Sequence, residues 1–167
     1  MYKYDNSSVR RQDRLLSENI AKDLLCNGEF CFMAMVEKIH NNCGGYGIPI
    51  SYVWDNEDYI YFHCAPDGHK LNCLDANPNV TLCIVGKTNV IPDKFTTAYQ
   101  SILIRGTAQR NLDEQERFHA LKLLLEKYST HHVETGLKYA KASFHRTEII
   151  RVKINNISGK EKKMLNF

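Results

Sequence analysis

The sequence of 167 residues predicts a mainly β protein with peripheral helices, in which about six antiparallel strands close into a small barrel. Runs rich in β-branched and aromatic residues recur along the chain between turn residues, as at 30–37, 45–54 and 59–64. These runs do not alternate regularly with helical patterns, which argues against a parallel, doubly wound sheet. The length suits one domain with a hydrophobic core.

A short amphipathic helix is expected ahead of the first strand. Ser17 is a suitable N-cap for residues 18–28, which place apolar side chains on one face and end at a glycine. The three strand-like runs that follow are joined by turns at 38–45 and 55–58, and they predict an antiparallel meander.

The middle of the chain predicts one or two helical turns at 70–77, ended by an Asn-Pro pair, and then a strand at 80–86. Residues 87–100 have weak periodicity and are expected to form a loop that leads into a strand at 99–110. Gly106, inside that run, is expected to mark a bulge or a bend.

The last third of the chain predicts two helices and a closing strand. Asp113 and Glu116 form a capping box for a helix at 114–128, and residues 136–145 predict a second helix. The alternation at 147–160 predicts a strand with one solvent-exposed face. The expected organisation is an N-terminal arm, one domain and a flexible tail, at 1–14, 15–160 and 161–167.

Composition limits the classes of function. Hydrophobic residues make up 43% and charged residues 25% of the chain, as in ordinary globular proteins. The net charge of +3 is too small and too evenly spread to argue for a nucleic-acid partner. No apolar run approaches the roughly 18 residues that a membrane span needs. The N-terminus lacks the apolar stretch of a secretory signal, so we expect a cytoplasmic location.

Six cysteines raise the question of a metal site or disulfides. None forms a CxxC pair, and most lie among apolar neighbours, so we expect reduced thiols and no metal. His40 and Cys43 could ligate a metal together, but their Asn- and Gly-rich segment is more typical of a hairpin loop.

The segment 61–74 is the strongest candidate for a binding site. Alternation puts His63 on the same face as Tyr61, and the turn at 65–68 that follows contains Pro and Gly. His69 and Lys70 come next, where the positive end of a short helix would add to the lysine charge. We interpret this corner as a phosphate site; an ordinary exposed turn is the alternative.

Pro49 supports a ligand next to this corner. Proline cannot donate a ladder hydrogen bond, so it predicts an edge or an irregularity where backbone groups are free. A planar ligand with amide-like edges could use these groups.

The order of these segments resembles the nitroimidazole-resistance (Nim) family of the pyridoxamine 5′-phosphate oxidase-like, flavin-binding split barrels. The resemblance covers roughly residues 10–160, and its most specific piece is "FHCAPDGHK" at 62–70. The run "FTTAYQSILIRG" at 95–106 supports it.

This resemblance implies a six-stranded antiparallel split β-barrel that forms a homodimer, with FMN or FAD in each of two grooves between the subunits. It also implies a set of cofactor-binding residues: Pro49, Ile50, Ser51, His63, Cys64, Ala65, His69, Lys70, Thr97, Tyr99 and Ser101. Family members commonly carry arginine where this chain has His69, and histidine offers no bidentate fork to a phosphate. Phosphate binding is therefore expected to be weaker or dependent on pH.

The leading functional hypothesis is a flavin-dependent reductase of small, electron-poor compounds such as nitroaromatics or nitroimidazoles. His63 is the expected catalytic residue, as a proton donor or substrate contact, because imidazole exchanges protons near neutral pH. Two alternatives stay open: a pyridoxamine 5′-phosphate oxidase-like oxidase, and a flavin- or haem-binding sensor or storage protein without turnover. The sequence has no nicotinamide fingerprint, so it does not reveal the electron donor.

Overall fold

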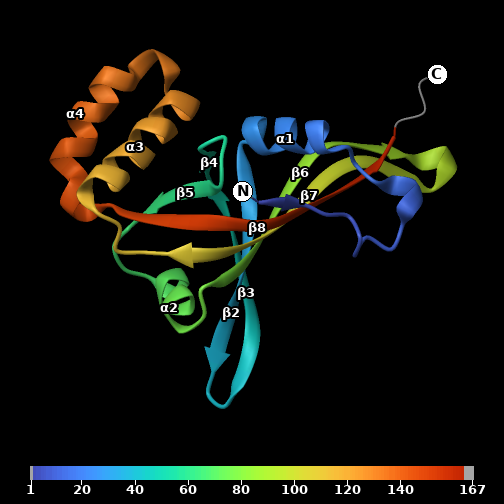
Figure 1. The fold of residues 1–167 in the computed structure, drawn as a ribbon, viewed down its shortest axis with the longest axis horizontal. Helices are drawn as coiled ribbons and strands as arrows, with labels where there is room; N and C mark the ends of the chain where they lie inside the picture. Colours follow the sequence, from blue (N-terminus) through green and yellow to red (C-terminus); the bar gives the residue numbers. More distant parts are fainter. Residues whose placement is uncertain (1, 164–167) are drawn as a thin grey trace.

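The computed structural model describes residues 2–163, which form one mainly antiparallel sheet with helices on both faces (Figure 1). Its strands are β1 (Lys3–Tyr4), β2 (Phe30–Ile39), β3 (Asn42–Ser51), β4 (Val53–Trp54), β5 (Tyr59–Cys64), β6 (Asn79–Ile91), β7 (Thr96–Gln109) and β8 (Glu148–Lys162). Its α-helices are α1 (Glu18–Asn27), α2 (His69–Ala76), α3 (Glu114–Tyr128) and α4 (Val133–Ser143).

The two outermost strands of the sheet, β3 and β4, are consecutive in the chain and are separated by one residue. Strands pair in the order β3-β2-β6-β7-β8-β5-β4, and β1 adds to β8 in parallel. Since β3 ends at Ser51 and β4 begins at Val53, the outermost strands are joined through Tyr52 alone. One residue spans only about 3.3–3.6 Å, so the sheet must curl on itself. Tyr52 is fully buried, and its hydroxyl donates to the carbonyl oxygen of Leu25 at 2.6 Å. The predicted split-barrel class is confirmed, but the described sheet has eight strands where six were expected, because the run 45–54 divides in two and the arm adds β1 in parallel.

The predicted meander is interrupted within its second strand. The run 45–54 divides at Tyr52, so β3 pairs with β2, whereas β4 pairs with β5. β5 then pairs with β8. A local pattern shows where strands form, but the curvature of the whole sheet decides which strands pair. The expectation for Pro49 is confirmed, because β3 is an edge strand.

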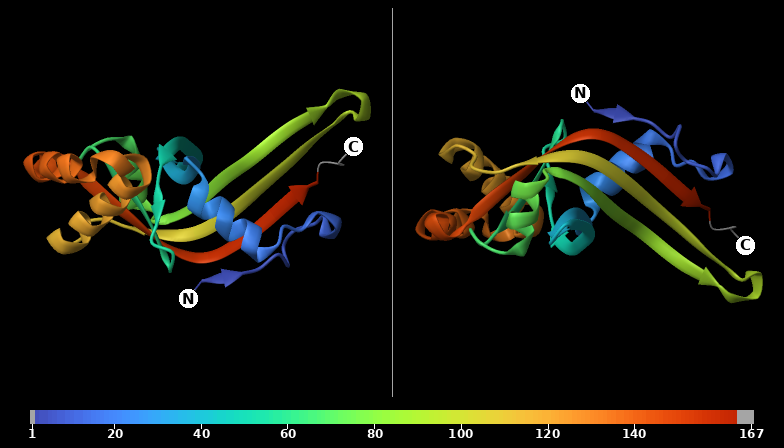
Figure 2. Two further views of the ribbon diagram at one scale, coloured as in Figure 1. Left: turned by 90° about the horizontal axis from the view of Figure 1, so that it is seen from above. Right: turned by 90° about the horizontal axis from the view of Figure 1, so that it is seen from below.

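The loop expected at 87–100 is mostly strand. β6 and β7 continue through it and form a long hairpin, which extends away from the α3–α4 end of the molecule (Figure 2). A register shift between Val85 and Thr88 interrupts the alternation there, which explains the weak periodicity. The bulge expected at Gly106 is confirmed by a register shift against β8, where a Cβ atom would lie 2.5 Å from Val152.

The C-terminal tail begins later than expected. β8 runs to Lys162, which pairs with Tyr99, so residues 161–162 belong to the sheet. Pairing with a strand distant in sequence supplies these hydrogen bonds, and no local pattern signals it. Residues 164–167 of the predicted tail lie outside the described residues.

Helices cover both faces of the sheet. The alternation predicted for β5 is confirmed, since Phe62 points into the main core and Tyr61 into a smaller one. α1 and α2 contribute Leu25 and Leu71 to the main core, whereas α3 contributes Leu124 to the smaller one. No helix in the described part of the chain is long and apolar enough to cross a membrane.

The N-terminal arm packs along β8 of its own chain. β1 pairs with β8, and the N–H of Leu16 donates to the carbonyl oxygen of Gly159 at 3.2 Å. The Tyr4 hydroxyl donates to the carbonyl oxygen of Leu16 at 2.6 Å, and the Asn6 side chain accepts from the N–H of Gly159 at 2.8 Å. The arm is therefore held to the sheet.

The hydroxyl of Tyr128, the last residue of α3, links the α3–α4 pair to Tyr52, the residue between β3 and β4. It accepts from the N–H of Tyr52 at 3.0 Å and lies 2.8 Å from the Tyr52 carbonyl oxygen. Tyr128→Phe leaves that N–H without its partner, so we expect urea titration to show a free energy of unfolding lower by about 1–3 kcal/mol.

Tyr139→Phe is the matched control for this substitution. Tyr139 is exposed on α4, and within the described residues no hydrogen bond involves its hydroxyl. Equal losses of stability in the two variants would contradict the assigned role of Tyr128.

Candidate flavin site

The turn after β5 places a glycine-capped helix start beside a lysine. β5 ends at Cys64 and α2 begins at His69, with Gly68 as the N-cap at a φ of 129°. This φ favours glycine, and a Cβ atom added there would meet nothing within 4 Å. The first N–H groups of a helix have no partners within it, so they add positive potential next to Lys70. The corner is open and suited to an anion.

His69 does not point freely into this corner. Its Nε2 lies 2.6 Å from the Glu37 carboxylate and 3.6 Å from the Cys73 sulfur. Its ring also packs edge-on against Tyr46, with 4.6 Å between ring centroids. The β2–β3 hairpin thus holds the imidazole, and Lys70 is the member of the predicted basic pair that is left for a phosphate.

Cys64 lies beside this lysine as a protonated thiol. Burial raises the pKa of Cys64, and the positive charge of Lys70 offsets only part of that effect. The thiolate form is therefore scarce at neutral pH, and Cys64 is suited to contact a ligand rather than to attack one.

A cavity of about 440 Å³ opens between the sheet and the α3–α4 pair and brings two predicted residues together. Ser51 from β3 and His63 from β5 both line it. The other lining residues come from α3, α4 and the segments that follow them: Leu121, Leu124, Leu125, Tyr128, Ser129, Gly136, Tyr139, Ala140, Ser143 and Thr147. Among the described residues that line it, none is Asp, Glu, Lys or Arg.

His63 is the titratable group that reaches this cavity from the sheet. It follows the buried Phe62 on β5 and points to the opposite face. His63 is exposed in the isolated chain, but the protein atoms around it partly desolvate the imidazole. This lowers the pKa of His63 from its ordinary value of 6.5, so the neutral imidazole predominates at neutral pH. A neutral imidazole can donate one hydrogen bond, accept another or bind a metal.

The remaining predicted residues divide between the two halves of the sheet. Pro49 lies on β3 two residues before Ser51, which lines the cavity. Ile50, between them, packs against the main core. Ala65 follows β5 in the exposed turn. Thr97, Tyr99 and Ser101 lie on β7, three strands away from β3, or about 14 Å at the usual strand spacing. One chain therefore does not bring all the predicted residues together.

The sheet also carries an apolar open face that the sequence did not reveal. Phe32 pairs with Pro49 on one side and with Cys83 on the other, and Cys83 pairs with Leu103. Large apolar side chains on this face are about half exposed: Phe30 59%, Phe32 47%, Val85 58% and Leu103 47%. Ser101 and Tyr99 lie two and four residues from Leu103, so they share the face.

The sequence also did not identify the helix residues that line the cavity as site residues, although it shows the apolar stripe to which some of them belong. The apolar stripe of the helix at 114–128 predicts a packed face, and Leu121, Leu125 and Tyr128 instead line the cavity in part. An apolar stripe predicts that a helix packs against another surface, but it cannot show whether the two surfaces pack tightly or leave a cavity between them.

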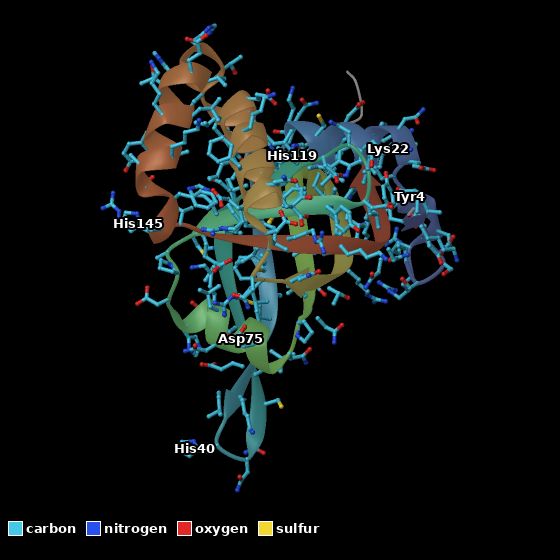
Figure 3. The ribbon with its side chains drawn as sticks, turned by 60° about the vertical axis from the view of Figure 1, so that its left-hand side comes forward. Tyr4, Lys22, His40, Asp75, His119 and His145 are labelled. Atoms are coloured by element: carbon cyan, nitrogen blue, oxygen red, sulfur yellow. The ribbon has the colours of Figure 1, made fainter. Side chains whose placement is uncertain are left out.

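The described residues contain no group of three or more His, Cys, Asp or Glu side chains that could hold a metal ion. Figure 3 shows the labelled histidines on separate parts of the molecule: His40 at the tip of the β2–β3 hairpin, His119 on α3 and His145 after α4.

A curled antiparallel sheet whose outer strands meet, with a positive helix start at the end of an inner strand, defines the class of split-barrel proteins. The chain belongs to the pyridoxamine 5′-phosphate oxidase family, whose sequence model matches residues 17–161. Among curated proteins, none matches this chain.

Solved structures share the fold at low sequence identity. A candidate 5-nitroimidazole antibiotic resistance protein from Bacteroides thetaiotaomicron is 18% identical, with a TM-score of 0.68 over 89% of this chain and 86% of its own. An FAD-binding protein from Mesorhizobium loti is 19% identical, with a TM-score of 0.61 over 90% of this chain and 98% of its own. An FAD- and haem-binding protein from Mycobacterium smegmatis is 17% identical, with a TM-score of 0.70 over 93% of this chain and 76% of its own.

Proposed function

We propose that this protein is a flavin-binding oxidoreductase that holds the phosphate of FMN or FAD at the start of α2. The observation that carries the proposal is the open corner formed by Gly68, the first N–H groups of α2 and Lys70. Helix N-termini with an adjacent cation favour phosphate groups. Family membership and the FAD-binding neighbours support the choice of a flavin as the phosphate-bearing ligand.

The edge of β3 suits the ring of the same cofactor. An edge strand exposes backbone N–H and C=O groups that no other strand uses, and Pro49 prevents a further strand from pairing fully along it. A flavin ring has an amide-like edge that can use such groups. Ser51, two residues after Pro49 and on the same face of β3, reaches the cavity that His63 also lines.

The cavity next to β3 suits a small, flat and uncharged substrate. Its described lining is apolar apart from hydroxyl groups and His63, so it offers no cation for a substrate phosphate. This disfavours pyridoxamine 5′-phosphate and favours electron-poor aromatic compounds such as nitroaromatics or nitroimidazoles. The bound flavin would supply the redox chemistry. In the chain itself, His63 would hold or deliver a proton at the cavity wall, and the α3–α4 pair would exclude water. A cytoplasmic location remains a prediction from the sequence.

The proposed site is completed by a second copy of the chain. The open face is apolar and half exposed, which is typical of an interaction surface. Two copies that pair through it by two-fold symmetry would place Thr97, Tyr99 and Ser101 of each β7 over the flavin groove of the other. The homodimer is thus part of the proposal.

A flavin- or haem-binding protein without turnover is the second candidate. The observation that favours it is a neutral His63 imidazole at the wall of an apolar cavity, because such a nitrogen is suited to haem iron. The Mycobacterium smegmatis neighbour binds FAD and haem.

The absorption spectrum of the purified protein tests both candidates. We expect flavin bands, and chromatography of the heat-released ligand should identify FMN or FAD. Stopped-flow reduction by NADH or NADPH, followed by a nitroaromatic compound, should show the flavin being reduced and then reoxidised. A strong Soret band with slow flavin turnover would favour the second candidate. Protein that takes up neither flavin nor haem would contradict both.

His63 is expected to control the pH dependence of substrate reduction. A proton donor must be protonated, and the lowered pKa of His63 means that the protonated fraction grows as the pH falls below 6.5. Reoxidation by the nitro compound should therefore accelerate towards acidic pH. His63→Gln should slow it about 100-fold and remove this acceleration.

His131→Gln is the matched control, because His131 is exposed in the segment after α3. It should leave the pH profile of reoxidation unchanged. A His63→Gln variant with normal rates and a normal profile would remove His63 from the mechanism.

A further inference from the structure

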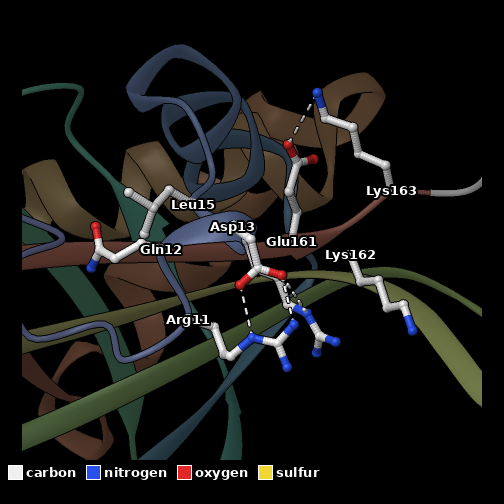
Figure 4. Close-up of a pocket in the computed structure, with 8 residues that line it drawn as sticks. Arg11, Gln12, Asp13, Leu15, Glu161, Lys162 and Lys163 are labelled. Carbon is white, nitrogen blue, oxygen red and sulfur yellow. Dashed lines mark hydrogen bonds and ion pairs between the residues drawn. The ribbon is translucent and has the colours of Figure 1, made fainter.

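A second cavity, of about 560 Å³, lies where the N-terminal arm meets the end of β8 (Figure 4). Residues 11–15 and 161–163 line it. Its lining includes four cationic residues and two acidic ones, a net charge of +2: Arg11, Arg14, Lys162 and Lys163 against Asp13 and Glu161. The cavity is thus polar and positive, unlike the one between the sheet and α3–α4.

The arm aligns two guanidinium groups side by side. The N–H of Arg14 donates to the carbonyl oxygen of Arg11 at 3.0 Å, which closes a 3₁₀ turn at Gln12–Arg14. Both arginine side chains reach the same Asp13 carboxylate, so their guanidinium groups lie close together. Arg11 donates to the Asp13 carboxylate at 2.8 and 2.6 Å, and Arg14 lies 3.8 Å from it.

The carboxylate between the arginines is a replaceable partner. The hydrogen bond from Arg11 lowers the pKa of Asp13 to about 2, so Asp13 is charged at neutral pH. Its side chain is 60% exposed, and exposed ion pairs are weak. Glu161 points the other way on β8, towards Gln100, and lies 3.9 Å from Lys163. An incoming anion with two charges can displace Asp13 from both guanidinium groups.

The backbone that carries these groups is fixed in place. Leu15 and Lys160 form a bridge between the arm and β8, and the N–H of Leu16 bonds to Gly159. A ligand would therefore not have to order this segment on binding, which lowers the cost of association.

This cavity borders the open face of the sheet. Lys162 pairs with Tyr99 across β8 and β7, and its ammonium group bonds to the Thr96 hydroxyl. The cations therefore stand at the end of the same surface on which Thr97, Tyr99 and Ser101 would face the flavin of the second copy.

We propose that this pocket binds the diphosphate group of a dinucleotide, an inference that rests on the proposed function for its role beside the flavin. Each guanidinium can bind one phosphate through two hydrogen bonds, so two adjacent guanidinium groups match two linked phosphates. Lys162 adds a further positive charge to the lining of this pocket. The diphosphate has two sources of the same chemistry. One is the FAD cofactor itself, whose linked phosphates would then lie here and not at the start of α2. The other is NADH or NADPH as the electron donor.

Isothermal titration calorimetry with ADP tests the pocket directly. The protein is loaded with FMN, which has no diphosphate, or used as purified if it takes up no flavin. Replacing both arginines, R11Q with R14Q, should raise the dissociation constant for ADP at least about tenfold. Asp13→Asn should lower it about two- to fivefold, because it frees the guanidinium groups. Lys122→Gln, on the exposed side of α3, is the control and should leave it unchanged.

The source of the diphosphate follows from two further measurements on the arginine double variant. A lower affinity for FAD with unchanged affinity for FMN would show that the diphosphate belongs to the FAD cofactor. A higher KM for NADH or NADPH would show that it belongs to the electron donor.

Equal ADP affinities in the wild type and the double variant would overturn the proposal, as would weaker binding by the Asp13→Asn variant. Protein that binds flavin but no ADP would overturn this pocket alone. Protein that binds ADP but no flavin would overturn the proposed function and leave the pocket standing.

Discussion

Lys70→Gln is expected to raise the dissociation constant for FMN by about 10- to 100-fold. A hydrogen bond between a charged donor and a phosphate contributes about 1.5–3 kcal/mol, and each 1.4 kcal/mol is about a factor of ten. Lys70 is the cation of the predicted pair that remains available to a phosphate, because the Glu37 carboxylate holds His69 at 2.6 Å, whereas Lys70 contacts only the neutral thiol of Cys64 among the described interactions. Fluorescence titration of flavin into the apoprotein measures the effect.

Two controls make this result specific to the phosphate. Riboflavin lacks the phosphate, so its affinity should be the same in the wild type and in Lys70→Gln. Lys122→Gln removes an exposed lysine on α3, paired with Glu126, and should not change FMN affinity. Full FMN affinity in Lys70→Gln, or an equal loss of riboflavin and FMN affinity, would place the phosphate elsewhere.

Leu103→Arg is expected to prevent the proposed homodimer from forming. Leu103 lies on the open face between Cys83 and Ser158, and it is 47% exposed in the isolated chain. Across a two-fold axis the substitution introduces two like charges into an apolar contact, which costs several kcal/mol. Sedimentation velocity should show the mass fall by half, and the flavin should be lost with the second subunit.

Tyr139→Arg is the matched control for the sedimentation measurement. It also introduces arginine at an exposed apolar residue, but on α4, away from the open face. This variant should stay dimeric. A dimeric Leu103→Arg protein would show that the copies pair through another surface, and a monomeric wild type with bound flavin would remove the second copy from the site.

Local signals in the sequence were sufficient for most helices and for the turn at the site. Ser17 caps α1 as predicted, with its hydroxyl accepting from the N–H of Ile20. Asp113 caps α3 by accepting from the N–H of Glu116 at 2.8 Å. Gly68 ends the turn before α2, where its positive φ requires glycine. These features depend on neighbours in the chain, which a sequence displays directly.

The pairing of strands and the surroundings of each candidate residue could not be predicted in this way. The division of one run into β3 and β4 depends on the burial of Tyr52, and the hold of Glu37 on His69 depends on the approach of α2 to β2. The amino-acid sequence by itself determined the β-rich class, the capped starts of α1 and α3, and the glycine-lysine corner, whereas α4 begins three residues earlier than predicted. The tertiary structure decided which strands meet, which face stays open and which cations are free, because these depend on contacts between residues far apart in the chain.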